Sequence, residues 1–304
     1  DLDTEQLGFL TTDKDGEGIR KIKAFNCPDK GEKVSLEEMI GYPITVPMCS
    51  PTQLANKLDN GSFIYDDCED GHEFVAEGMT EEKVDRCAEI SMYYHASKIY
   101  NYIRGLYKDI DSTGKFYLQN NDADRPLNVI GNFQMPDTSD IQAIMNGTAK
   151  LVPMDNAFFS QDNPSIGDLL GQFGVKGDLL VFGQGTKGDF GFDGDVIYHE
   201  FGHATVYTAG IAGMEFTDKY GISNEPGSVH EGIADTFAFL MTDNTCTGEY
   251  ASEAIVKWAT SQGGMVEMDS EGTGDSKVYC MRTALNEYSV FEDFIGEVHW
   301  DGQP

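Results

Sequence analysis

Hydrophobic residues recur at helical spacing in the segment that begins at Thr80. In "TEEKVDRCAEISMYYHASKIYNYIRGLY" a hydroxyl suited to an N-cap precedes two acidic residues, which favour the first turn of a helix. The apolar positions are Val84, Cys87, Met92, Ala96, Ile99, Ile103 and Leu106. This spacing predicts a long amphipathic helix. His95 on this helix has no partner at ligand spacing, so we interpret it as a packing or surface residue.

Strand-like apolar runs surround this segment. The runs "LNVIGNF", "LVPMDNAFF" and "LLVFGQG" are separated by Asp, Asn, Gly and Pro, and residues 1–75 contain shorter ones such as "YPITVPM" and "GSFIY". Helical spacing returns over 195–210, 228–242 and 250–262, and a further short helix is expected over 281–288. The pattern predicts an α+β fold with two lobes. The expected parts are a small strand- and turn-rich region (1–75), a lobe with a long helix and a sheet (76–194), and a helical lobe (195–304).

The charge and the apolar content of the chain disfavour several classes of protein. The chain of 304 residues carries 52 acidic against 21 basic side chains, a net charge of −31, which disfavours a nucleic-acid or anionic-membrane partner. It has no apolar run of 18 residues, so no membrane span is expected. The acidity fits either a solvated surface or calcium sites. The stretch "DKDGEG" suggests a calcium loop, but an EF-hand read from Asp13 places Ala24 where a Glu is needed.

Six cysteines are scattered along the chain without a CxxC pair. An even, scattered set is typical of disulfides in an oxidising compartment, whereas reduced core thiols in a cytosolic protein are the alternative. Pairing between neighbours predicts disulfides between residues 27 and 49, 68 and 87, and 246 and 280. The chain opens on the acidic "DLDTEQLGFL" without a visible signal peptide, so we expect a mature or trimmed secreted form.

The stretch "DVIYHEFGHATVY" carries the strongest chemical signal. His199 and His203 are four residues apart and therefore share one face of a helix, so both imidazoles can bind one metal ion. Glu200 lies beside them and is placed to act on a water molecule. A buried helix whose histidines are satisfied by hydrogen bonds is the alternative, but it gives Glu200 no role.

A second helical segment, in "NEPGSVHEGIADTFAFLM", supplies the third ligand that a catalytic zinc requires. Glu231 is the preferred candidate, because Asp235 then lies one turn further on the same face. There Asp235 can accept a hydrogen bond from a ligand imidazole and fix its tautomer. His230 is the competing ligand.

In the order of these motifs the sequence resembles the thermolysin and fungalysin clan of zinc metallopeptidases, whose pattern is HExxH followed by ExxxD. "HEFGH" and "EGIAD" carry the resemblance, together with "ISMYYHASKIYNYI", "NAFF", "LLVFGQG" and "GEVHWDG". It covers roughly residues 85–300. The resemblance implies a two-lobed fold and a secreted zinc-dependent endopeptidase that cuts peptide or protein substrates.

The resemblance also implies roles for individual residues. His199, His203 and Glu231 would ligate zinc, Glu200 would be the general base, and Asp235 would orient His199. His299 in "GEVHWDG" would donate to the oxyanion. Substrate binding would fall to three residues: Asn156 and Ala157, which would pair with an extended peptide, and Arg282, which would hold a substrate carbonyl.

The sequence departs from the family pattern at several points. The stretch "TAGIAGMEF" lacks the family's oxyanion tyrosine, for which Tyr220 is a weak substitute, and Thr242 occupies a carboxylate position of the family's calcium pair, with Asp243 next to it. The chain ends five residues after His299, so the helical lobe is expected to be incomplete. The alternative function is a weakly active or inactive metallopeptidase-like binding module at a cell surface, with a surface assembly partner. Calcium is a second possible cofactor.

Overall fold

The structure is a computed structural model, and it describes nine stretches of the chain: residues 22–55, 81–110, 126–161, 166–210, 216–218, 221–223, 225–261, 268–274 and 277–285. The chain divides into two compact units. One comprises residues 1–100 and 120–192, and the other comprises residues 101–119 and 193–304. Helices and sheets are both present, which confirms the α+β class. None of the helices in the described stretches is long and apolar enough to cross a membrane.

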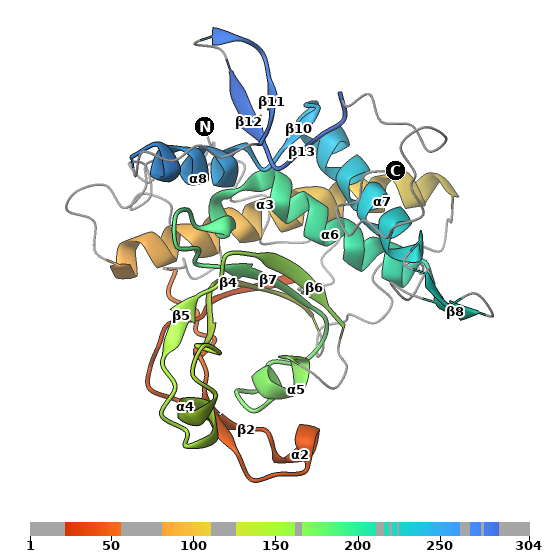
Figure 1. The fold of residues 1–304 in the computed structure, drawn as a ribbon. Helices are drawn as coiled ribbons and strands as arrows, with labels where there is room; N and C mark the ends of the chain where they lie inside the picture. Colours follow the sequence, from red (N-terminus) through yellow and green to blue (C-terminus); the bar gives the residue numbers. More distant parts are fainter. Residues whose placement is uncertain are drawn as a thin grey trace. The chain divides into compact units, whose positions relative to one another are not determined.

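A mixed sheet organises the first unit (Figure 1). Its strands follow the order β1 (Ile22–Asn26), β4 (Leu127–Pro136), β7 (Leu179–Gly183) and β6 (Ala157–Ser160), while β5 (Leu151–Pro153) pairs with β4. The pairs β1–β4 and β4–β7 are parallel, whereas β6 runs antiparallel to β7. Every residue of β7 is buried, as expected for a central strand with a continuous apolar sequence. The three predicted strand runs are confirmed.

The long helix is also confirmed, as α3 (Glu81–Ile110). Its N-terminal part packs on the sheet of the first unit. Gly131 in β4 permits this close approach, because a Cβ atom there would lie 2.4 Å from the Cε atom of Met92. Glu89, fully buried on α3, accepts a hydrogen bond of 2.8 Å from the Nδ2 atom of Asn26 in β1. Helix and sheet are thus joined by both apolar and polar contacts.

Short elements complete the first unit. Strands β2 (Lys33–Ser35) and β3 (Thr45–Pro47) form a hairpin around α2 (Glu37–Ile40), which confirms a strand in "YPITVPM". The predicted strand "GSFIY" lies outside the described residues. The disulfide Cys27–Cys49 is buried in the same core as Val34 and Leu179. The remaining elements are α4 (Ile141–Met145), α5 (Ile166–Gly171) and the short 3₁₀ helix η1 (Phe190–Phe192).

Three helices dominate the second unit: α6 (Gly194–Thr208), α7 (Glu225–Thr242) and α8 (Glu249–Ser261). The helices predicted over 195–210, 228–242 and 250–262 are therefore confirmed, with shifted ends. Asp193 explains where α6 begins. Its Oδ1 atom accepts hydrogen bonds from the backbone N–H groups of Asp195 and Val196, and its Oδ2 atom accepts one from Ala251 in α8. One buried N-cap therefore ties together the starts of two helices.

Helices α6 and α7 lie against each other at Gly202. A Cβ atom on Gly202 would be 2.7 Å from the Cα atom of Ala234, a distance that real Cβ contacts do not reach. Gly202 lies between the two histidines of the HExxH motif, and Ala234 lies between Glu231 and Asp235. The absence of a side chain at residue 202 therefore brings the two motif-bearing helices into direct contact.

The helix expected over 281–288 is wrong for the described part of that range. Residues Arg282–Thr283 form the strand β13, which pairs antiparallel with β10 (Cys246–Thr247). The disulfide Cys246–Cys280 fixes this pairing. Two further hairpins, β8–β9 (Phe216–Asp218 with Gly221–Ser223) and β11–β12 (Asp269–Glu271 with Val278–Cys280), belong to the same unit. Contacts made far along the chain outweigh the local helical spacing here.

Candidate metal centre

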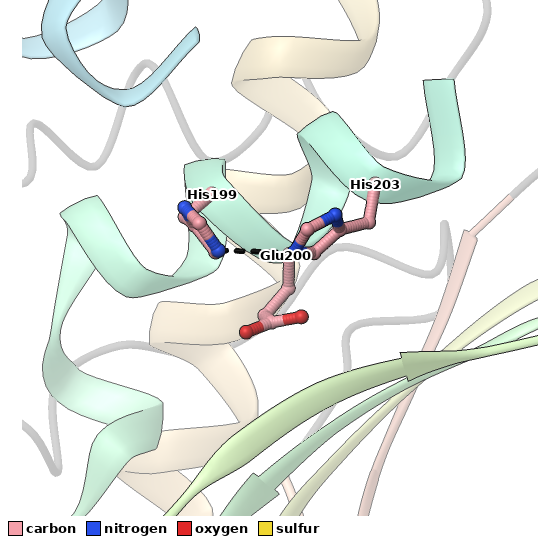
Figure 2. Close-up of side chains that lie close together, drawn as sticks. All are labelled: His199, Glu200 and His203. Atoms are coloured by element: carbon pink, nitrogen blue, oxygen red, sulfur yellow. Dashed lines mark hydrogen bonds between the residues drawn. The ribbon is translucent and has the colours of Figure 1, made fainter. Parts of the chain in front are cut away.

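Helix α6 presents His199, Glu200 and His203 as one buried group whose donor atoms could hold a metal ion (Figure 2). Each of the three side chains is at most 7% exposed. The Nε2 atoms of the two histidines lie 3.0 Å apart, which follows from their placement one helical turn apart. Their lone pairs can therefore reach one shared position.

Glu231 reaches the same position from α7. Its Oε2 atom lies 3.1 Å from Nε2 of His199, and its Oε1 atom lies 3.3 Å from Nε2 of His203. Two ligands at about 2.0–2.1 Å from a tetrahedral zinc ion are about 3.3–3.4 Å apart. The three separations fall within a few tenths of an ångström of that value, so the donor set fits a four-coordinate metal.

Glu200 has a different environment from Glu231. Figure 2 shows its carboxylate extending away from the line that joins the two imidazole nitrogens. Its Oε2 atom is buried and has no hydrogen-bond partner among the described residues. Burial raises the pKa of Glu200 above its ordinary value, although the imidazoles of His203 and His199 act in the opposite direction. A buried, unpaired carboxylate oxygen beside a metal position is suited to hold a water molecule and accept its proton.

Asp235 contacts the ring nitrogen of His199 that faces away from the metal position. Its Oδ1 atom lies 2.7 Å from Nδ1 of His199. Burial alone would lower the pKa of His199, but its hydrogen bonds to Asp235 and Glu231 outweigh burial and raise the pKa to about 9. The same bonds from His199 and His203 lower the pKa of Glu231, against the effect of its burial. All of these carboxylates therefore act to attract a positive charge to this position.

His230 occupies the corresponding position beside His203. The Nδ1 atoms of the two rings lie 2.6 Å apart, and both side chains are buried. Burial and the neighbouring His203 lower the pKa of His230 to about 4, so its ring is neutral near pH 7. The sequence identified His230 as a competitor of Glu231 for the metal, but in the structure it is Glu231 whose oxygens face both Nε2 atoms.

Arg282 joins this group from strand β13. Its Nε atom lies 2.8 Å from Oδ2 of Asp235, and its Nη2 atom lies 3.1 Å from Nδ1 of His199. The Cys246–Cys280 disulfide and a hydrogen bond from the Thr247 hydroxyl to the Arg282 carbonyl hold the strand in place. These contacts to Asp235 and His199 were not foreseen from the sequence, because nothing local to Arg282 indicates its pairing with β10.

The expected substrate residues Asn156 and Ala157 belong to the first unit. Ala157 begins β6, which ends the strand order of the sheet, and the carbonyl of Asn156 accepts a hydrogen bond of 2.9 Å from the N–H of Gly183. His299 and Tyr220 lie outside the described residues. Cys68 also lies outside the described residues. The disulfides Cys27–Cys49 and Cys246–Cys280 form as predicted.

A pair of acidic side chains near the start of α6 was not expected from the sequence. Burial and a hydrogen bond to Glu249 raise the pKa of Asp195 to about 9, so the carboxyl group of Asp195 holds a proton at neutral pH. At the position where the family's calcium pair has a carboxylate, Thr242 donates its hydroxyl to the Ala238 carbonyl. Across the described stretches, the place around His199, Glu200 and His203 is the one where three or more such donors gather closely enough to hold a metal ion.

Comparison of the chain with models of known protein families and with curated proteins finds no match.

Proposed function

We propose that the chain is a zinc-dependent endopeptidase in which His199, His203 and Glu231 hold the metal ion. The Nε2 atoms of the two buried histidines lie 3.0 Å apart, and the two oxygens of the partly buried Glu231 carboxylate lie 3.1 and 3.3 Å from them. This convergence supports the proposal most directly. Two histidines and one carboxylate from separate helices are a donor set used by catalytic zinc sites in hydrolases. Three protein ligands leave the fourth position for water or substrate.

When bound, zinc would lower the pKa of a water molecule and polarise the scissile carbonyl. Glu200 takes a proton from the attacking water as its oxygen forms a bond to the carbonyl carbon. The C–N bond then breaks, and Glu200 passes that proton to the leaving amine. The buried and unpaired Oε2 atom of Glu200 suits this role, because no other described group competes for its lone pairs.

Asp235 and Arg282 hold the ring of His199 in its ligating orientation. The family resemblance adds His299 as the donor to the oxyanion. It also adds the edge strand that begins at Ala157, beside Asn156, as the site where an extended peptide pairs by main-chain hydrogen bonds. The two disulfides among described residues favour a secreted protein, because such bonds persist in oxidising compartments.

A metallopeptidase-like binding module that keeps the metal without turnover is the second candidate. The stretch "TAGIAGMEF", which lacks the family's tyrosine, favours it. Both candidates predict zinc binding, whereas only the first predicts cleavage.

The test is hydrolysis of a set of internally quenched peptides by the full zinc-loaded chain. Glu200→Gln keeps the side-chain shape but cannot accept the proton, so it should retain zinc and lose roughly 10²–10⁴-fold in turnover. Glu253→Gln, which changes an exposed carboxylate on α8, is the matched control and should cleave as the wild type does. Equal rates for Glu200→Gln and the wild type would exclude the catalytic role. Zinc binding without any cleavage would favour the second candidate.

A further inference from the structure

A direct contact between two imidazole rings adjoins the metal position. The Nδ1 atoms of His203 and His230 lie 2.6 Å apart, and the ring centroids are 4.8 Å apart with the planes tilted by 31°. Both side chains are less than one-tenth exposed. Two ring nitrogens at this distance form a hydrogen bond only if one carries a proton and the other presents a lone pair.

The geometry around His203 decides which nitrogen donates. Its Nε2 atom lies 3.0 Å from Nε2 of His199 and 3.3 Å from Oε1 of Glu231, so with the proposed metal ion bound among these groups this nitrogen gives its lone pair to the ion. In a neutral imidazole the proton must then be on Nδ1. His230 therefore accepts through its own Nδ1 atom and carries its proton on Nε2.

We propose that His230 is a positioning residue that fixes the tautomer and the ring orientation of the metal ligand His203. This inference rests on the proposed metal site and extends it to a residue that does not touch the metal. Metal-binding histidines usually donate their second N–H to a carboxylate, a backbone carbonyl or water. His203 instead donates to a neutral ring.

Two neighbouring residues of helix α7 contact the His203 ring from opposite sides. Successive residues on a helix point about 100° apart, so His230 reaches the Nδ1 side of His203 while Glu231 reaches its Nε2 side. The adjacent pair therefore contacts the ring from both sides and leaves it little freedom to turn. A ligand that is already oriented loses less conformational entropy when the metal binds.

A neutral acceptor also limits the negative charge at the site. Glu200, Glu231 and Asp235 already place three carboxyl groups around the two histidines. A fourth carboxylate beside His203 would be buried among them and repelled by them. His230 supplies the acceptor without that added charge.

The first test measures zinc affinity by competition with a chromogenic chelator, using the full chain. In His230→Asn the amide oxygen can take the place of Nδ1, so zinc affinity should stay within about threefold of wild type. His230→Leu leaves the Nδ1–H group of His203 without an acceptor and should weaken zinc binding by about 10–100-fold. His95→Leu, which removes an imidazole from α3, is the control for losing a ring and should leave the affinity unchanged. Equal affinities for His230→Leu and His230→Asn would overturn the proposal.

The second test needs no substitution. Long-range ¹H–¹⁵N NMR of the zinc-loaded wild type reports which ring nitrogen carries the proton. The expected result is a proton on Nδ1 of His203 and on Nε2 of His230, and a proton on Nδ1 of His230 would overturn the proposal. A wild type that binds no zinc would instead refute the metal site itself. Failure of the inference and failure of the proposed function are therefore distinguishable.

Discussion

The Nδ1 atom of His199 lies 2.7 Å from Oδ1 of Asp235, and the second oxygen of that carboxylate is held by Arg282 at 2.8 Å. These contacts connect Arg282 on a strand and Asp235 on α7 with the proposed metal ligand His199. A carboxylate bonded to the ring N–H increases the basicity of a ligand histidine and fixes its orientation. Because Arg282 binds the same carboxylate, the position of Asp235 is fixed in turn.

Removing the charge of Asp235 should weaken metal binding. Asp235→Asn keeps the shape of the side chain but replaces the carboxylate that accepts from His199 and pairs with Arg282. We expect zinc affinity to fall by about 10–100-fold in a chelator competition assay. Asp243→Asn, at an exposed residue just after the same helix, is the control and should bind as wild type. An Asp235→Asn variant with wild-type zinc affinity would show that the contact between Asp235 and His199 does not contribute to zinc binding.

A substitution of Arg282 distinguishes two roles for this residue, one in positioning a metal ligand and one in binding substrate. Arg282→Gln removes the bond to Asp235, so zinc affinity should decrease by about tenfold, at the lower end of the roughly 10–100-fold range of such outer contacts. The role inferred from the family resemblance, contact with a substrate carbonyl, instead predicts a higher KM at full zinc occupancy. Measuring zinc affinity and KM on the same variant separates the two. Unchanged zinc affinity would rule out the positioning role.

The Cys246–Cys280 disulfide should stabilise both the fold and the metal centre. It closes a loop with a sequence separation of 34 residues, for which the chain-entropy model gives about 3–4 kcal/mol. The double variant Cys246→Ser/Cys280→Ser should therefore unfold at lower urea concentration. It should also bind zinc less tightly, because the disulfide fixes the strand that carries Arg282.

The control for this prediction is Cys27→Ser/Cys49→Ser, in the first unit, which should lose stability while keeping its zinc affinity. Equal zinc affinities in both double variants would show that the disulfide Cys246–Cys280 does not contribute to zinc binding.

The buried carboxyl group of Asp195, hydrogen-bonded to Glu249, predicts how stability depends on pH. The pKa of Asp195 is about 9 in the folded protein, mainly through burial, against 3.8 as the ordinary value. The folded state therefore holds a proton that the unfolded state has released between these limits. The stabilisation that this proton gives is complete below about pH 4 and is lost as the pH rises through about 9.

Asp195→Asn has no proton to lose, so from pH 6 to 9 its free energy of unfolding should rise relative to that of wild type. One pKa unit corresponds to about 1.4 kcal/mol, and a relative gain of at least that size is expected. Urea unfolding at several pH values measures it, with Glu37→Gln, at an exposed residue, as the control. A difference that stays constant over this pH range would contradict the proton held by Asp195.

Local spacing determined much of what the sequence predicted. His199 and His203 converge because residues one turn apart share a helix face, and Asp235 follows Glu231 for the same reason. The long helix and the strand runs were also evident, because their apolar periods are local properties of the chain.

What escaped prediction depends on contacts between distant segments. The sequence shows that His230 and Glu231 are neighbours on one helix, but not how that helix is rotated against α6. The close contact of Gly202 with Ala234 sets that rotation. Likewise, Arg282 was assigned to a helix because its pairing with β10 and the adjoining disulfide have no local signal.

Zinc content tests the central claim most directly. Elemental analysis of the protein, purified without added metal and dialysed, should show about one zinc ion per chain, because a preorganised site of two buried imidazoles and a partly buried carboxylate binds tightly. His199→Ala and Glu231→Ala should each lose most of that zinc, whereas Glu253→Gln should keep it. A wild type without zinc, or a His199→Ala variant with its full complement, would contradict the account.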